Sequence, residues 1–169
     1  MKKIIFIFSV VLLSAHIHAQ GKDESKQKNL LYHPEENAAA GIAEAVKKAK
    51  QEKKQVLIQA GGNWCGWCLE FNRFVHADPP IDSLLKANYI VYHLNYSKEN
   101  KNEPIFEQYH FPQRFGFPVF LILNSEGQLI HTQNSAYLEE GKTYDRKKVL
   151  DFLNDWNLKA LDADTYRKQ

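Results

Sequence analysis

The stretch Trp64-Cys65-Gly66-Trp67-Cys68 decides how this sequence is interpreted, because it holds the only two cysteines of the 169 residues, with two positions between them. Two thiols spaced in this way can close into a disulfide with each other. The apolar run 55–60 just before it is typical of a short buried strand, and the residues from Leu69 onward follow a helical pattern. The pair is therefore predicted at a strand-to-helix junction, which favours redox chemistry over packing.

A sulfur at the start of a helix is expected to be reactive. The free backbone N–H groups and the positive end of the helix dipole both favour a thiolate there. We therefore expect the pKa of Cys65 to lie below the value of about 8.5 that is typical of free cysteine. Cys68 lies three residues further along on the same helix face, close enough to resolve a mixed disulfide held on Cys65. Cys65 is thus the candidate nucleophile and Cys68 the candidate resolving cysteine.

The other residues of the stretch have predicted supporting roles. Gly66 is expected to permit a tight turn at the start of the helix. Trp64 and Trp67 are expected to flank the sulfurs with flat apolar surface, which would limit water and contact a substrate chain.

The first nineteen residues have the layout of a secretory signal peptide. Lys2 and Lys3 precede the apolar run 4–13, and residues 14–19 lead to a cleavage site predicted after Ala19. The apolar run is too short for a bilayer-spanning helix, although an uncleaved membrane anchor is the alternative interpretation. We therefore expect an exported protein, periplasmic or secreted, without stable membrane insertion after cleavage.

Charge and length narrow the possible classes of protein. The chain carries 22 basic and 20 acidic residues, and loss of the signal peptide would remove two lysines and leave the charges balanced. This balance does not indicate a nucleic-acid partner. The remaining chain, about 150 residues, suits one domain with a single core. In an oxidising compartment one cysteine pair is too small a framework to staple a fold, so turnover explains it better.

The sequence predicts a flexible polar lead-in over residues 20–33, one domain over 34–161 and a C-terminal tail over 162–169. The helix-like segments are 34–53, the residues after Cys65, 81–86, 104–109 and 145–161, and the strand-like segments are 55–60, 89–96, 119–123 and 128–132. This order predicts an α/β fold around a mixed sheet of four to five strands, with helices on both faces. The first two strands are expected to be parallel and the last two to form an antiparallel hairpin.

With the motif Arg114-Phe115-Gly116-Phe117-Pro118, the cysteine stretch makes the sequence resemble the thioredoxin superfamily. The resemblance covers about residues 34–161 in element order and is similar in pattern to exported thiol:disulfide interchange proteins of bacterial periplasms. It implies a thioredoxin-like fold in which Pro118 follows a cis peptide bond and stands opposite the two sulfurs. It also implies that the backbone of Phe117 pairs with an extended segment of substrate.

Two departures from the thioredoxin pattern concern the chemistry. Gln59 stands six positions before the first cysteine, where thioredoxins carry a buried Asp, and an amide cannot accept a proton as a carboxylate does. Deprotonation of Cys68 must then rely on water or another group. The dipeptide Gly66-Trp67 between the cysteines differs from the Gly-Pro of thioredoxin and the Gly-His of protein disulfide isomerases. The reduction potential of neither protein can therefore be transferred to this chain.

The pattern predicts an exported thiol–disulfide oxidoreductase that acts on cysteine-containing exported proteins and is recharged by a redox partner protein. It would need no metal or organic cofactor beyond the Cys65–Cys68 disulfide. The alternative is a non-catalytic module that binds a peptide or partner and keeps a structural disulfide. Zinc is disfavoured because His76 and His93 lack ligand spacing to the cysteines. His93 is expected to be a half-buried or edge histidine, or else to replace the buried basic residue of some thioredoxins.

Overall fold

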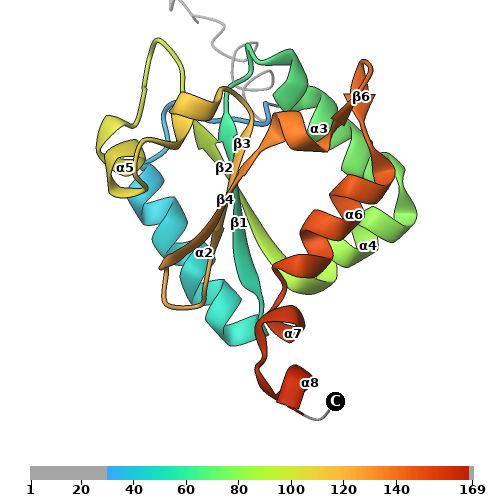
Figure 1. Cartoon of the computed structure of the whole chain (residues 1–169). Coiled ribbons are helices and arrows are strands. Elements are labelled where there is room, and N and C mark those ends of the chain that lie inside the picture. Colours follow the sequence, from blue (N-terminus) through green and yellow to red (C-terminus); the bar gives the residue numbers. More distant parts are fainter. Residues whose placement is uncertain (1–29, 168–169) are drawn as a thin grey trace, which may run out of the picture.

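The computed structural model describes residues 30–167, and a mixed sheet of four strands forms their centre (Figure 1). The strands lie in the order β2-β1-β3-β4. β1 runs parallel to β2, while β3 is antiparallel to both β1 and β4. The predicted parallel pair and hairpin are therefore confirmed. The bounds are β1 (Gln55–Gly61), β2 (Tyr89–Asn95), β3 (Val119–Leu123) and β4 (Leu129–Asn134).

β1 is the middle of the core because every one of its residues is buried. Its side chains alternate between the two faces, as the pleat of a strand requires. Val56, Ile58 and Ala60 belong to one apolar cluster, and Leu57 belongs to the cluster on the opposite face. A strand covered on both faces reads as a continuous apolar run, which is why the sequence marks β1 so clearly.

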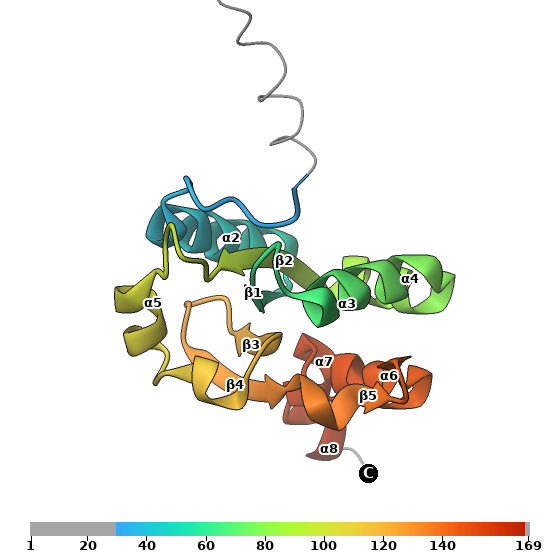
Figure 2. The ribbon, with the colours of Figure 1, turned by 90° about the horizontal axis from the view of Figure 1, so that it is seen from above.

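Helices cover both faces of the sheet (Figures 1 and 2). The cluster on one face includes residues of α2 (Ala38–Glu52) and α5 (Glu103–Gln108). The cluster on the other face includes residues of α3 (Gly66–Ala77), α4 (Pro79–Asn88) and α6 (Arg146–Asp155). The cysteine-bearing helix thus shares its apolar cluster on the sheet with α4 and α6.

Two predicted helix starts are wrong, and the caps explain why. The first helix begins at Ala38 rather than at residue 34, because the Asn37 side chain accepts a hydrogen bond from the Ala40 N–H. The helix predicted over 81–86 begins at Pro79, because Asp78 caps α4 through the Ile81 N–H and Pro79 occupies the first helical position. A proline lacks the N–H that would be unpaired at that position.

The predicted helix 145–161 is two helices. α6 ends at Asp155, and α7 (Leu158–Leu161) starts after Asn157, whose side chain accepts a hydrogen bond from the Ala160 N–H. A further turn, α8 (Asp164–Arg167), lies in the predicted tail. The sequence did not predict four small elements, which are η1 (Pro112–Phe115), η2 (Ser135–Leu138), β5 (Glu139–Glu140) and β6 (Thr143–Tyr144).

At the amino end, the predicted signal peptide and residues 20–29 of the predicted lead-in lie outside the described residues. Tyr32, however, is fully buried, and Asn63 makes hydrogen bonds to both its backbone N–H and its carbonyl. Tyr32 is therefore packed into the domain although it precedes the first helix. No helix within residues 30–167 has the length and apolar character needed to cross a membrane.

Candidate active site

Cys65 and Cys68 form a disulfide at the start of α3. Cys65 is the cap of this helix: its backbone is extended, and its Sγ atom accepts a hydrogen bond from the Cys68 N–H at 3.2 Å. The sulfur thus takes one of the N–H groups that a helix start leaves without a backbone partner. Together with the helix dipole, this contact favours negative charge on the Cys65 sulfur once the disulfide is open.

The two cysteines differ in access to solvent. Cys65 is 5% exposed and Cys68 is completely buried. Packing therefore covers most of Cys65 in the disulfide state. Only Cys65 retains accessible surface, and this order of access suits a first cysteine that meets the substrate and a second that acts from beneath.

The two tryptophans are not equivalent, although the sequence places them symmetrically. Trp64 is 60% exposed, and its indole N–H donates to the Tyr96 carbonyl at 2.7 Å. Trp67 is half-buried, and its ring meets the Tyr144 ring edge-on with centroids 5.5 Å apart. Tyr144 also donates a hydrogen bond to the Trp67 carbonyl. Trp67 therefore belongs largely to the core, and Trp64 is the tryptophan that offers surface beside the sulfurs.

The motif around Pro118 meets the cysteine stretch in space. The Phe117–Pro118 peptide bond is cis, the isomer that the resemblance implies. Phe117 packs against the cluster that contains both cysteines, and its ring contacts the Trp64 ring edge-on at 5.6 Å between centroids. Val119, the residue after Pro118, pairs with Ala60 near the end of β1. The two sequence motifs, 50 residues apart, thus form one site.

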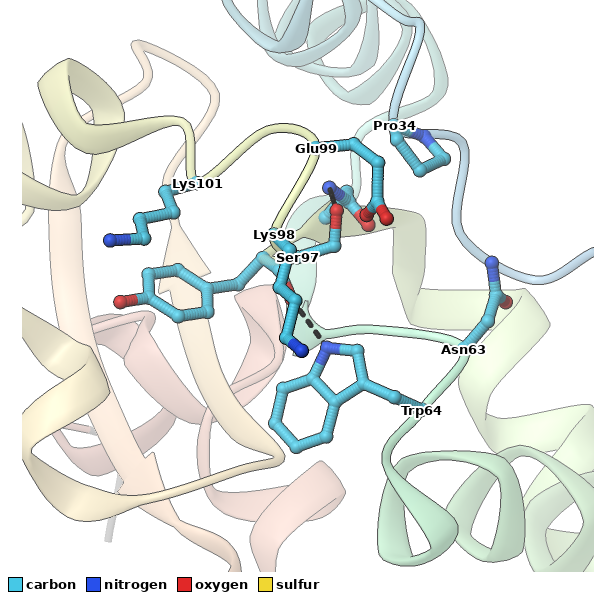
Figure 3. Close-up of a pocket in the computed structure, with 9 residues that line it drawn as sticks. Pro34, Asn63, Trp64, Ser97, Lys98, Glu99 and Lys101 are labelled. Carbon is cyan, nitrogen blue, oxygen red and sulfur yellow. Dashed lines mark hydrogen bonds between the residues drawn. The ribbon is translucent and has the colours of Figure 1, made fainter.

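A hollow of about 420 Å³ lies beside this site (Figure 3). Asn63 and Trp64 line it on the side of the cysteine stretch. The opposite side comes from Pro34 and from the loop after β2, including Ser97, Lys98, Glu99 and Lys101. Trp64 therefore presents its indole both to Phe117 and to a cavity.

Gln59 lies buried beneath the disulfide. Its side-chain nitrogen donates to the Cys68 carbonyl at 2.9 Å and to the Tyr32 hydroxyl at 2.8 Å. Gln59 thus ties the first turn of α3 to β1, although it provides no carboxylate.

His93 pairs with Gln59 across the sheet, and its ring meets the Tyr32 ring edge-on at 5.5 Å between centroids. Burial lowers the pKa of His93 to about 4, with smaller effects from the charges of His76 and His33. His93 is half-buried on an edge strand, as the first interpretation expected, and it is neutral at neutral pH. It therefore does not replace a buried positive charge.

Gly66 does not need the conformational freedom of glycine. Its backbone φ is not positive, and an added Cβ would meet no atom within 4 Å. The prediction that it permits a tight turn is therefore wrong. Within residues 30–167, no group of three or more His, Cys, Asp or Glu side chains is arranged to hold a metal ion.

Comparison with known proteins places this geometry in context. A family model described as thioredoxin-like matches residues 37–125. Among solved structures, a disulphide isomerase from Xylella fastidiosa Temecula1 has a TM-score of 0.66 at 21% identity, with 75% of this chain and 96% of that chain covered. A structure described as DsbH oxidoreductase has a TM-score of 0.51 at 17% identity, with 85% of this chain and 96% of that chain covered. A thioredoxin from Thermus thermophilus has a TM-score of 0.50 at 21% identity, with 70% of this chain and 85% of that chain covered. No curated protein matches the chain.

Proposed function

The chain belongs to the thioredoxin-like family, and from this membership we propose that it is an exported thiol–disulfide oxidoreductase acting on cysteines of other exported proteins. One observation carries the proposal: the Cys65 sulfur caps α3 and accepts the Cys68 N–H, while the buried Cys68 is bonded to it. This arrangement stabilises a thiolate on the outer sulfur and keeps a second sulfur within bonding reach.

In the proposed exchange, the reduced protein reduces a substrate disulfide. The Cys65 thiolate attacks one substrate sulfur, and the electron pair of the broken S–S bond leaves on the other substrate sulfur as a thiolate. Cys68 then loses its proton and attacks the Cys65 sulfur. The Cys65–Cys68 disulfide forms, and the substrate leaves as a dithiol once its thiolates are protonated. Oxidation of a substrate dithiol follows the same steps in reverse, with the enzyme pair reduced.

Substrate contact is assigned to the surface on the Trp64 side. The rings of Trp64 and Phe117 form an apolar surface next to the small part of Cys65 that is exposed. The backbone of Phe117 lies just before β3, where an extended substrate segment is proposed to pair with it. Pro118 shapes this segment. The redox partner that recharges Cys65 and Cys68 is proposed to use the same surface, since both reactions require access to Cys65.

Export is part of the proposal and is supported by the signal-peptide pattern of residues 1–19. Export would bring the protein to a compartment where disulfides form and persist. The substrates are accordingly exported proteins, and the proposed chemistry needs neither a metal nor an organic cofactor.

Redox titration separates this function from a binding module with a structural disulfide. In glutathione buffers of graded potential, an exchange enzyme should pass from dithiol to disulfide between about −120 and −270 mV. A midpoint below about −300 mV would indicate a structural bridge and would support the binding module. The measurement follows alkylation of free thiols by mass spectrometry, and Cys65→Ala/Cys68→Ala protein is the control that takes up no label.

Trp64 and Trp67 give a matched test of the substrate surface. We expect Trp64→Ala to lower kcat/KM for a protein disulfide several-fold and to change the free energy of unfolding by no more than about 0.5 kcal/mol, because the side chain is exposed. Trp67→Ala should cost about 2 kcal/mol of stability, because it removes packing on Tyr144. Insulin reduction and urea unfolding measure the two effects. Equal stability losses would contradict the assignment of Trp64 to the surface and of Trp67 to the core.

A further inference from the structure

Tyr32 brings a buried hydroxyl to the underside of the disulfide. The side chain is fully buried and packs in one cluster with Cys65 and Cys68. Its position is fixed at three points: Asn63 makes hydrogen bonds to both its backbone N–H and its carbonyl, the His93 ring contacts its ring, and Gln59 donates to its hydroxyl. A side chain constrained in this way holds its hydroxyl at one place.

The direction of the Tyr32 hydroxyl proton follows from the orientation of Gln59. The Cys68 carbonyl can only accept a hydrogen bond, so the Gln59 side-chain atom 2.9 Å from it must be the nitrogen. The same nitrogen lies 2.8 Å from the Tyr32 oxygen and can only donate to it. The hydroxyl therefore accepts from Gln59, and its own proton points away from Gln59.

Gly61 shows what lies on that other side. A Cβ atom built on Gly61 would have three nearest neighbours: the Cys68 sulfur, the Cys68 Cβ and the Tyr32 hydroxyl oxygen at 2.9 Å. The hydroxyl and the inner sulfur thus both lie against Gly61, on the side where another residue would carry its side chain. Within residues 30–167, the Tyr32 hydroxyl donates no hydrogen bond in the disulfide state.

We propose that Tyr32 is a catalytic residue that donates a hydrogen bond to the Cys68 sulfur whenever that sulfur carries negative charge. The inference rests on the proposed function. When an incoming thiolate opens the Cys65–Cys68 bond, the electron pair moves to the Cys68 sulfur, and the Tyr32 O–H stabilises the thiolate. In the reverse direction the same hydrogen bond favours ionisation of Cys68 before it attacks Cys65. Tyr32 keeps its proton in both directions, and the proton that Cys68 releases on ionising passes to water or to a thiolate of the departing substrate.

The surroundings support a donor that remains protonated. Burial raises the pKa of Tyr32 above its ordinary value, and the hydrogen bond from Gln59 opposes this only in part. The His93 ring, which contacts the Tyr32 ring, is kept neutral at neutral pH by burial. Gln59 fills the position of the thioredoxin carboxylate without being able to ionise, so among these neighbours Tyr32 is the group that can respond to charge on Cys68.

The test measures the ionisation of Cys68 in Cys65→Ser protein, where it is the single thiol. Adding Tyr32→Phe removes only the hydroxyl, and we expect the Cys68 pKa to rise by about one to two units, the value of one charge-assisted hydrogen bond. The thiolate absorbance or the ¹³Cβ shift of Cys68 follows the titration. Tyr89→Phe is the matched control, because it removes another buried hydroxyl, bonded to the Leu153 carbonyl, and should leave the Cys68 pKa unchanged.

A second measurement keeps Tyr32 in place, so it does not depend on the folding of Tyr32→Phe. In Cys65→Ser protein, the ¹³Cζ shift of Tyr32 should titrate together with Cys68. The proposal is overturned if the ¹³Cζ shift of Tyr32 stays constant while Cys68 ionises. It is also overturned if the Cys68 pKa is unchanged in a folded Tyr32→Phe variant.

The two proposals fail separately. Insulin reduction by the unmodified protein tests the oxidoreductase function and does not test the role of Tyr32. The Cys68 titration uses protein without Cys65 and requires no turnover. An active protein whose Cys68 pKa is insensitive to Tyr32→Phe would keep the function and remove Tyr32 from it.

Discussion

Cys65→Ser protein is expected to reduce insulin no faster than the reductant does without protein. The serine hydroxyl keeps the cap of α3, since serine is a good N-cap residue, but it is not ionised at neutral pH and cannot attack a disulfide. The variant therefore removes the nucleophile while leaving the helix start intact. Insulin turbidity in the presence of dithiothreitol measures the rate, and unfolding of the reduced wild-type protein provides the reference for stability.

Cys68→Ser protein should behave differently, because it keeps the nucleophile and loses the resolving sulfur. Mixed disulfides with substrate are then expected to accumulate on Cys65 and to disappear on addition of dithiothreitol, which mass spectrometry detects directly. Activity of Cys65→Ser equal to that of the wild type would contradict the proposed mechanism. A covalent adduct on Cys68 in the Cys65→Ser protein would reverse the assigned roles of the two cysteines.

The parts of the fold that the sequence predicts are those with strong local patterns. β1 is a continuous apolar run because it is covered on both faces, and β3 is predicted with its observed bounds, Val119–Leu123, because Phe117-Pro118 and the turn at Asn124 delimit it. The cysteine pair and its helix were predicted for the same reason, since the spacing of the motif is local. Helix ends were predicted less well, because caps such as Asn37 and Asn157 act through single hydrogen bonds.

The part of the site that the sequence does not predict depends on contacts between distant segments. Tyr32 lies before the first helix, at the end of a polar stretch and 36 residues before Cys68. Its burial depends on Asn63, whose amide holds the Tyr32 backbone from the loop before the cysteines. The sequence indicates only that order begins near Tyr32, which is weak evidence for a buried ring.

Trp64 and Trp67 show the same limit at the active site itself. Their positions on either side of Gly66 and Cys65 suggest equal access, yet the first residue lies before the helix and the second within it. The start of α3 at Gly66 turns Trp67 toward Tyr144, a residue of the unpredicted β5–β6 hairpin. Because each strand of this hairpin has only two residues, the sequence contains no periodic pattern that predicts them.

Gly61→Ala is expected to damage both the stability and the chemistry of the site. The new methyl group would lie closer to the Cys68 sulfur than Cβ atoms come in proteins, and 2.9 Å from the Tyr32 hydroxyl oxygen. Neither neighbour moves aside easily, since the disulfide holds the sulfur and Gln59 holds the hydroxyl. We expect a loss of about 1–3 kcal/mol in the free energy of unfolding, the usual cost of overpacking a close-packed core. Urea unfolding of the oxidised protein measures it.

Gly66→Ala is the matched control, because it makes the same chemical change one residue after Cys65. Nothing lies within 4 Å of the added methyl group, and alanine is favoured over glycine in a helix. This variant should unfold at the same urea concentration as the wild type or a higher one, and its thiol–disulfide exchange should be unchanged. If both substitutions proved neutral, the surroundings of Gly61 would be looser than the structure shows, and the placement of the Tyr32 hydroxyl and the Cys68 sulfur against this residue would lose its support. A loss of stability in Gly61→Ala alone would show that the positions of the Cys68 sulfur and the Tyr32 hydroxyl require a residue without a side chain at position 61.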